Sequence, residues 1–133
     1  MESSKAYSYK DLIVWQKAMT LVVEIYELTK CFPKEEMYGI TSQIRRSAVS
    51  IPSNIAEGKY RSSKKDFKRF LEISYGSGAE LETQIEIAKN VFKKEGFDYS
   101  KVEELLLEVM KMLNKMITSI RINISQLTNI LIT

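Results

Sequence analysis

The 133-residue chain has no histidine and a single cysteine, and these absences exclude whole classes of chemistry. Without histidine there is no Ser-His-Asp triad, no histidine general base and no histidine ligand for zinc. The lone Cys31 cannot form a disulfide within the chain, which fits a reducing cytoplasm, and no histidine is present to activate it as a nucleophile. We therefore expect a cytoplasmic protein that is not an enzyme and holds no metal and no cofactor.

Long apolar runs and helix breakers are also scarce. No stretch of 18 apolar residues is present, so no membrane span is expected, and residues 1–9 lack the apolar segment of a signal peptide. The chain has five glycines and two prolines, and this scarcity favours long helices. Because 44% of the residues are hydrophobic, residues 1–133 are expected to form one globular domain.

The spacing of apolar residues predicts four helices, at about residues 11–30, 39–58, 63–94 and 100–129. A serine followed three residues later by an acid, the capping-box pattern, precedes three of them at Ser8, Ser63 and Ser100. Gly58 is expected to lie just beyond the end of the second helix. Helices of this length joined by short loops predict an all-α, up-down-up-down four-helix bundle.

The second helix is expected to organise the bundle. Ile44, Ala48, Ile51 and Ile55 form one apolar face, and Pro52 lies within that face. A proline inside a helix removes the donor for the carbonyl four residues earlier, so a kink is expected there. Since such a defect costs about 3 kcal/mol, the other helices are expected to pack around this one and compensate for it.

The third helix has small residues in the middle of its apolar seam. Gly76 and Gly78 would each weaken a helix by about 1 kcal/mol, which is tolerable where another backbone comes close. Close helix packing is the favoured interpretation, and a ligand slot is the alternative. The glutamates of this helix have no histidine beside them for a di-metal site, so they are expected to be solvated or paired with basic residues.

Two helices have more apolar residues than a four-helix core needs. The surplus residues are a second stripe in the first helix (Val14, Ala18, Leu21, Ile25 and Leu28, beside Leu12, Trp15, Met19, Val22, Tyr26 and Thr29) and Leu105, Met112, Ile117, Ile122 and Ile130 in the fourth. Apolar surface that a monomer would expose to water predicts a homo-oligomer. The alternative is that the core is simply wide.

The charge is distributed unevenly along the chain. The net charge is +3, but the segment from Arg45 to Arg69 has eight basic and two acidic residues, so it carries +6 and the rest carries −3. Cations in the first turns of a helix oppose its dipole, so helix stability does not explain them, whereas they suit a bound phosphate. The candidate nucleic-acid-binding residues are Arg45, Arg46, Arg61, Lys64, Lys65, Lys68 and Arg69. The alternatives are a solvated surface or salt bridges between subunits to Glu80, Glu82 and Glu86.

Four segments carry a resemblance to a known family. Residues 9–18, 36–46, 50–58 and 76–84 resemble bacterial four-helix-bundle proteins that include those encoded in intervening sequences of 23S ribosomal RNA genes. The resemblance covers about residues 7–120, and Ser47 stands where an alanine is expected. It implies a ring-like homopentamer whose role is largely unassigned. Related accessory proteins of diversity-generating retroelements imply nucleic acid, or a protein that processes it, as a partner.

The resemblance also implies an architectural role for one set of residues, and it transfers no catalytic residue. The architectural set is Pro52, Asn54, Glu57, Gly58, Gly78, Glu80 and Glu82. The sequence thus predicts a non-enzymatic oligomeric bundle that binds RNA or a nucleoprotein partner through basic residues near the turn between the second and third helices. The alternative is a structural scaffold or protein–protein adaptor with no nucleic-acid role.

Overall fold

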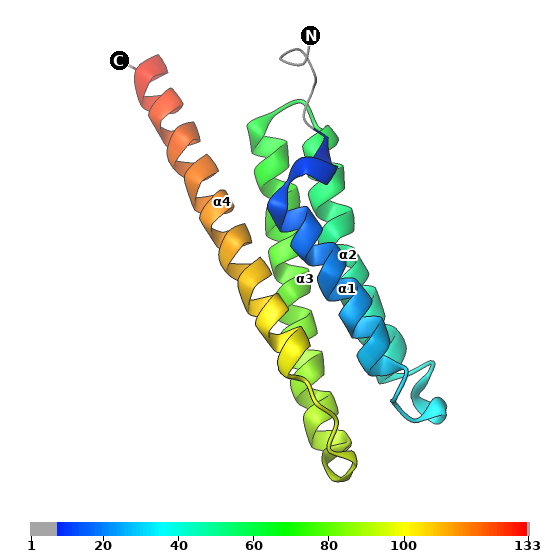
Figure 1. Cartoon of the computed structure of the whole chain (residues 1–133). Helices are drawn as coiled ribbons and strands as arrows, with labels where there is room; N and C mark the ends of the chain where they lie inside the picture. The colour runs from blue at the N-terminus through cyan, green and yellow to red at the C-terminus, as the bar shows by residue number, and fades with distance from the viewer. Residues whose placement is uncertain (1–7, 133) are drawn as a thin grey trace.

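A computed structural model describes the backbone of residues 8–132 and the side chains of residues 8–125. This part of the chain forms four α-helices: α1 (Ile13–Thr29), α2 (Ile40–Tyr60), α3 (Lys64–Val91) and α4 (Ser100–Ile132). Three short 3-10 turns, η2 (Tyr9–Asp11), η3 (Lys34–Glu36) and η4 (Lys93–Glu95), lie before and between them (Figure 1). The described residues contain no strand, so the all-α prediction is confirmed. The prediction for Ile130 lies outside the described side chains.

Each helix packs antiparallel against two neighbours. Contacts join α1 to α2 and α4, and they join α3 to α2 and α4. Two ion pairs of 3.3 Å fix the register of α1 against α4. Lys17 of α1 pairs with Glu108 of α4, and Glu24 of α1 pairs with Lys101 of α4. Residue numbers that rise on one helix and fall on the other require opposite directions. The arrangement is therefore the predicted up-down-up-down bundle.

The apolar face of α2 lies at the centre of this bundle. Its members Ile44, Ala48, Ile51 and Ile55 are all fully buried, as the sequence predicted. The helix continues on both sides of Pro52, which is itself buried. Beside the proline, the hydroxyl of Ser74 on α3 donates a 2.9 Å hydrogen bond to the carbonyl of Ile51. This contact from α3 holds α2 next to the proline, about one turn after the Ala48 carbonyl that loses its helical donor. The kink stays a prediction.

The structure reverses the prediction for the two stripes of α1. The stripe expected to be surplus is the core stripe, since Val14, Ala18, Leu21 and Ile25 are all at most 1% exposed. The other stripe is only partly covered, because Thr29 is buried and Leu12, Trp15 and Val22 pack against the core, whereas Met19 and Tyr26 are each 39% exposed. In α4, Ile117 was also expected to be surplus but is buried. The core is thus wider in α4 than predicted, whereas α1 leaves apolar surface uncovered.

Some of the predicted helix ends and caps differ from the structure. Gly58 lies inside α2, not beyond it, because the helix continues to Tyr60 and Gly58 has no positive φ angle. The capping box at Ser8 belongs to η2 rather than to α1. The Ser63 cap is confirmed, because its hydroxyl accepts a hydrogen bond from the backbone N–H of Asp66 at 3.1 Å. The hydroxyl of Ser100 instead bonds Asp98, two residues earlier.

Glycine has a packing role at two helical positions. A Cβ added to Gly58 would lie 2.7 Å from the Cβ of Phe70, so glycine is what allows α2 and α3 to come close. Gly78 faces the side chain of Met110 on α4, which agrees with the predicted close packing. The same prediction is wrong for Gly76, because no heavy atom lies within 4 Å of the space where its Cβ would be.

This difference predicts opposite effects of one substitution at two glycines. The Gly58→Ala variant places a methyl group against Phe70 and Phe67, and we expect it to lose about 1–3 kcal/mol of unfolding free energy. The matched control, Gly76→Ala, adds the same methyl group in open space and should gain up to about 1 kcal/mol of helix stability. Urea unfolding followed by circular dichroism measures both. Equal effects of the two substitutions would contradict the close α2–α3 contact.

Candidate nucleic-acid interface

The seven basic residues predicted to bind nucleic acid form two separate groups. Arg45 and Arg46 lie near the start of α2, whereas the other five surround the turn between α2 and α3. Arg46 and Arg61 are separated by 15 positions, which at a rise of 1.5 Å per residue places them about 22 Å apart along α2. The structure therefore does not bring the seven residues into one site.

Arg45 has a structural role. Its Nε atom donates a 2.8 Å hydrogen bond to the hydroxyl of Thr29, and its guanidinium lies over the ring of Tyr26, 4.5 Å from the centroid. Both partners belong to the last turn of α1. Since the side chain is half-buried and its Nε–H is already bonded, Arg45 holds α1 against α2.

The five residues Arg61, Lys64, Lys65, Lys68 and Arg69 form what we call the turn cluster. Two of them stack on one aromatic ring, because the guanidinium groups of Arg61 and Arg69 lie 4.9 Å and 4.6 Å from the centroid of Phe70. Arg61 also bonds the carboxylate of Glu57 at 2.8 Å. Lys68 pairs with Glu72, one turn further along α3, at 3.0 Å. Three of the five cations thus have intrachain partners.

Lys64 and Lys65 are the two cations of the turn cluster without such a partner. Both side chains are exposed, and neither makes an ion pair or a hydrogen bond with any residue that the structure describes. They occupy the first turn of α3, directly after the Ser63 cap, where backbone N–H groups have no helical acceptor. Two free ammonium groups beside a positive helix end are well placed for an anion.

Tyr60 is an exposed aromatic residue beside the turn cluster. Bundle tyrosines usually pack inside, but this one ends α2 and is 80% exposed, next in sequence to Arg61. Its ring lies 5.8 Å from that of Tyr9, so an aromatic pair adjoins the turn cluster. The sequence feature that could have predicted this exposure is the position of Tyr60 at the end of the second helix, where a side chain has few neighbours to cover it.

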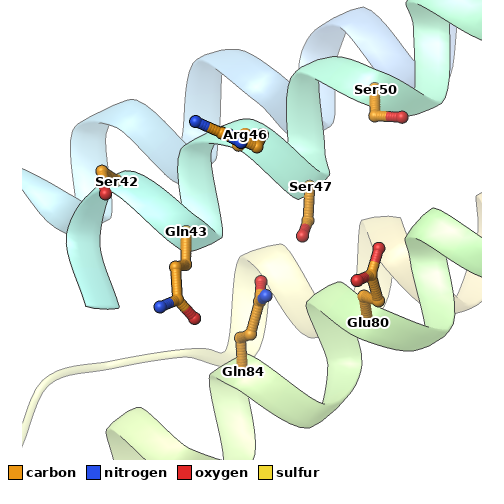
Figure 2. Close-up of a pocket in the computed structure, with 7 residues that line it drawn as sticks. All are labelled: Ser42, Gln43, Arg46, Ser47, Ser50, Glu80 and Gln84. Atoms are coloured by element: carbon orange, nitrogen blue, oxygen red, sulfur yellow. The ribbon is translucent and has the colours of Figure 1, made fainter. Parts of the chain in front are cut away.

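Arg46 belongs to a second site, a polar groove between α2 and α3 with a volume of about 510 Å³ (Figure 2). Its lining residues are Ser42, Gln43, Arg46, Ser47 and Ser50 from α2 and Glu80 and Gln84 from α3. We call this site the α2–α3 groove. Sequence reasoning gave no role to Gln43 or Gln84. The signal for Gln84 was its position one turn after Glu80, which puts both on one face of α3.

The residues given an architectural role occupy different surroundings. The side-chain amide of Asn54 donates to the carbonyl of Ser50 at 2.9 Å, and Glu57 bonds Arg61. Glu80 lines the α2–α3 groove, and Glu82 lines a smaller groove against α4. Neither glutamate has an ion-pair partner within the described part of the chain.

Ionisable groups with shifted pKa values lie away from both sites. A hydrogen bond from Ser100 lowers the pKa of Asp98, burial raises the pKa of Tyr99, and a hydrogen bond to Glu103 raises the pKa of Lys89. Lys89 also pairs with Glu86 at 3.4 Å, so that glutamate has an intrachain partner. Within the described residues, no three Cys, Asp or Glu side chains are grouped to hold a metal ion, and no helix is suited to span a membrane.

Comparisons with known proteins identify the family. The family model described as 23S rRNA-intervening sequence protein matches residues 10–115. A solved structure from Bacteroides thetaiotaomicron, of a protein with unknown function from the S23 ribosomal protein family, is similar with a TM-score of 0.69 and 27% sequence identity. That similarity covers 79% of this chain and 98% of the other. The search of curated proteins found no match. Because the family model spans most of its length, this chain belongs to the 23S rRNA-intervening sequence protein family.

Proposed function

We propose that this protein is a non-enzymatic, cytoplasmic homo-oligomer that binds structured RNA through the turn cluster. The observation that carries the proposal is the pair of exposed ammonium groups of Lys64 and Lys65, which have no partner among the described residues. The name of the family connects its members with 23S rRNA, so a structured ribosomal RNA fragment is the first ligand to test.

The rest of the turn cluster supports phosphate binding at little energetic cost. The ion pairs of Arg61 with Glu57 and of Lys68 with Glu72 lie at the surface, where such pairs contribute only about 0–1 kcal/mol. Exchange of these carboxylates for an RNA phosphate therefore costs little. Arg69 is held over Phe70, which orients its guanidinium before any ligand arrives. Tyr60 offers an exposed ring on which an unpaired base can stack.

Two uncovered surfaces support assembly into a homo-oligomer. The first is an apolar groove of about 370 Å³ between α1 and α2, lined by Tyr9, Trp15, Met19, Val22, Val49, Pro52, Ser53 and Ala56. The second is the C-terminal part of α4, which stands away from α1 in Figure 1. The pairing of Lys17 with Glu108 places the start of α1 near residue 112, so α4 extends about 30 Å beyond it. Ile122 is 52% exposed there. A ring-like homopentamer is the arrangement that the family resemblance implies.

The second candidate function is a scaffold or protein–protein adaptor without a nucleic-acid role. The observation that favours it is the pair of exposed carboxylates of Glu80 and Glu82, which have no cation partner in the described chain. In this alternative they pair with Lys64 and Lys65 of a neighbouring subunit. Charge reversal at Lys64 and Lys65 distinguishes the two functions, because it should break the assembly of a scaffold but leave the assembly of an RNA-binding oligomer intact.

The RNA proposal predicts that the double variant Lys64→Glu/Lys65→Glu loses binding. Each lost phosphate contact should reduce the slope of log K against log salt by about 0.7–0.9. The matched control is Lys93→Glu/Lys94→Glu, which changes the charge equally at exposed neighbouring lysines of η4. Binding to a structured ribosomal RNA fragment is measured by fluorescence anisotropy over a salt series, and light scattering follows the oligomer.

Loss of binding in the first variant, with the control and the oligomer unchanged, supports the RNA function. Equal loss in both variants would mean that only net charge matters, and it would reject the turn cluster as the site. No binding by the unmodified protein at low salt would also reject it. Dissociation of the oligomer in the Lys64/Lys65 variant would support the scaffold function instead.

The assembly proposal predicts a mass several times 15.4 kDa by multi-angle light scattering. In the Met19→Glu variant a charge enters the apolar groove between α1 and α2, and we expect a smaller species because burying an unpaired carboxylate is costly. Val23→Glu is the control, since Val23 is 55% exposed on the same helix but does not line the groove. A monomeric unmodified protein, or equal dissociation of both variants, would contradict the proposed interface.

A further inference from the structure

The α2–α3 groove contains polar groups that the described part of the chain leaves without partners. The side chains of Gln43, Arg46, Glu80 and Gln84 make no hydrogen bond or ion pair with any described residue. The oxygen of the Gln84 amide is buried and still lacks a donor. Buried polar atoms in folded proteins nearly always have a partner, and an unpartnered one at a cavity needs a physical explanation.

Four of the groove side chains converge from two helices, whereas the Arg46 side chain extends along α2 (Figure 2). Figure 2 shows Gln43 and Ser47 of α2 pointing towards α3, with Glu80 and Gln84 of α3 pointing towards α2. Glu80 and Gln84 are four residues apart, so a carboxylate and an amide lie one above the other on the same helix face. Both supply acceptor oxygens. The volume of about 510 Å³ is within the range of small-molecule sites.

Some of the lining side chains already have hydrogen-bond partners within the chain, so only the others are available to a ligand. The Ser42 hydroxyl donates to the carbonyl of Gly39 at 3.0 Å, and the hydroxyls of Ser50 and Ser77 share a 2.8 Å hydrogen bond. The remaining charges of the groove are one cation, Arg46, and one anion, Glu80. A groove with one charge of each sign does not favour a polyanion, and it suits a ligand that carries both charges.

We propose that the α2–α3 groove binds a guanidinium group on Glu80 and Gln84, with the ligand's carboxylate on Arg46. A guanidinium has a planar fork of N–H donors that fits a carboxylate in bidentate fashion and has donors left for an amide oxygen. Rotation of the Gln84 amide towards the groove brings its oxygen to such a donor and removes the unsatisfied buried acceptor. The proposal stands on the groove alone and does not depend on the RNA function of the turn cluster.

The ligand chemistry has two sources, free L-arginine, or an arginine side chain of a second copy of the chain together with an acidic side chain of that copy, which supplies the carboxylate. The two are separated by light scattering during the titration. If a neighbouring subunit fills the groove, added L-arginine competes with it and lowers the average mass. If the groove takes the free molecule, L-arginine binds and the mass does not change. Both outcomes support guanidinium recognition.

The test is a titration of the isotope-labelled full-length protein with L-arginine, followed by NMR of the side-chain amides. We expect saturable shifts at Gln43 and Gln84. Loss of a hydrogen bond to a charged group predicts that Glu80→Gln and Gln84→Leu each weaken binding by about tenfold or more. Glu82→Gln is the matched control, because it removes a carboxylate from the same helix outside the groove. Circular dichroism confirms that each variant is folded.

Ligand variants test the two charges separately. L-Citrulline keeps the shape and several N–H donors of arginine but lacks its positive charge, so it should bind about tenfold more weakly. Agmatine lacks the carboxylate, so it should bind to the unmodified protein more weakly than L-arginine does. The Arg46→Ala substitution should weaken the binding of L-arginine but should not weaken the binding of agmatine. The proposal is overturned if L-arginine causes no saturable shift. It is also overturned if Glu80→Gln has no effect, or if unpaired ribonucleotides bind in the groove and L-arginine does not.

Discussion

Where α2 passes α3, the two backbones are separated by glycine and small hydroxyl side chains rather than by large aliphatic ones. Gly58 lies against Phe70, Ser74 bonds the carbonyl of Ile51, and Ser50 bonds Ser77. These contacts lie between residues 50 and 58 of α2 and hold a proline-containing helix against a neighbour that supplies a hydrogen bond beside the proline. The position of α3, and therefore that of α4, follows from this contact between α2 and α3, which we call the α2–α3 seam.

The same seam determines both candidate sites. At one end it brings Arg61 and Arg69 onto the ring of Phe70 and leaves the first turn of α3 exposed. At the other end longer polar side chains lie between the two helices, and they line the α2–α3 groove. One pair of helices thus presents a cationic surface and a groove of mixed charge about 22 Å apart, as the helical rise sets that spacing.

The sequence predicted the fold well because each helix has a strong apolar period. The buried face of α2 and the serine cap of α3 follow directly from residue spacing. Spacing could not decide which stripe of α1 faces the core, since both stripes are apolar and only the positions of α2 and α4 distinguish them. It also mistook Gly58 for a helix end, because a glycine required by a neighbouring aromatic ring has the same local pattern as one required by a turn.

The candidate site was harder to predict because the surroundings of its members depend on partners distant in sequence. Arg45 and Arg46 are adjacent, yet one is held by Thr29 and Tyr26 of α1 while the other lines a groove with Gln84 of α3. No local pattern separates them. The exposure of Lys64 and Lys65 follows from their position at a helix start, which depends only on nearby residues, whereas their role in binding stays a prediction.

The contacts between neighbouring helices have a consequence for how the chain folds. Three of the four helix pairs in contact are consecutive in sequence, so each needs only a short loop to close. The fourth pair, α1 with α4, joins residues as distant as Lys17 and Glu108 and closes the longest loop. Loop-closure entropy rises with loop length, so the antiparallel hairpin of α2 and α3 can form early, whereas the seam between the first and last helices closes late.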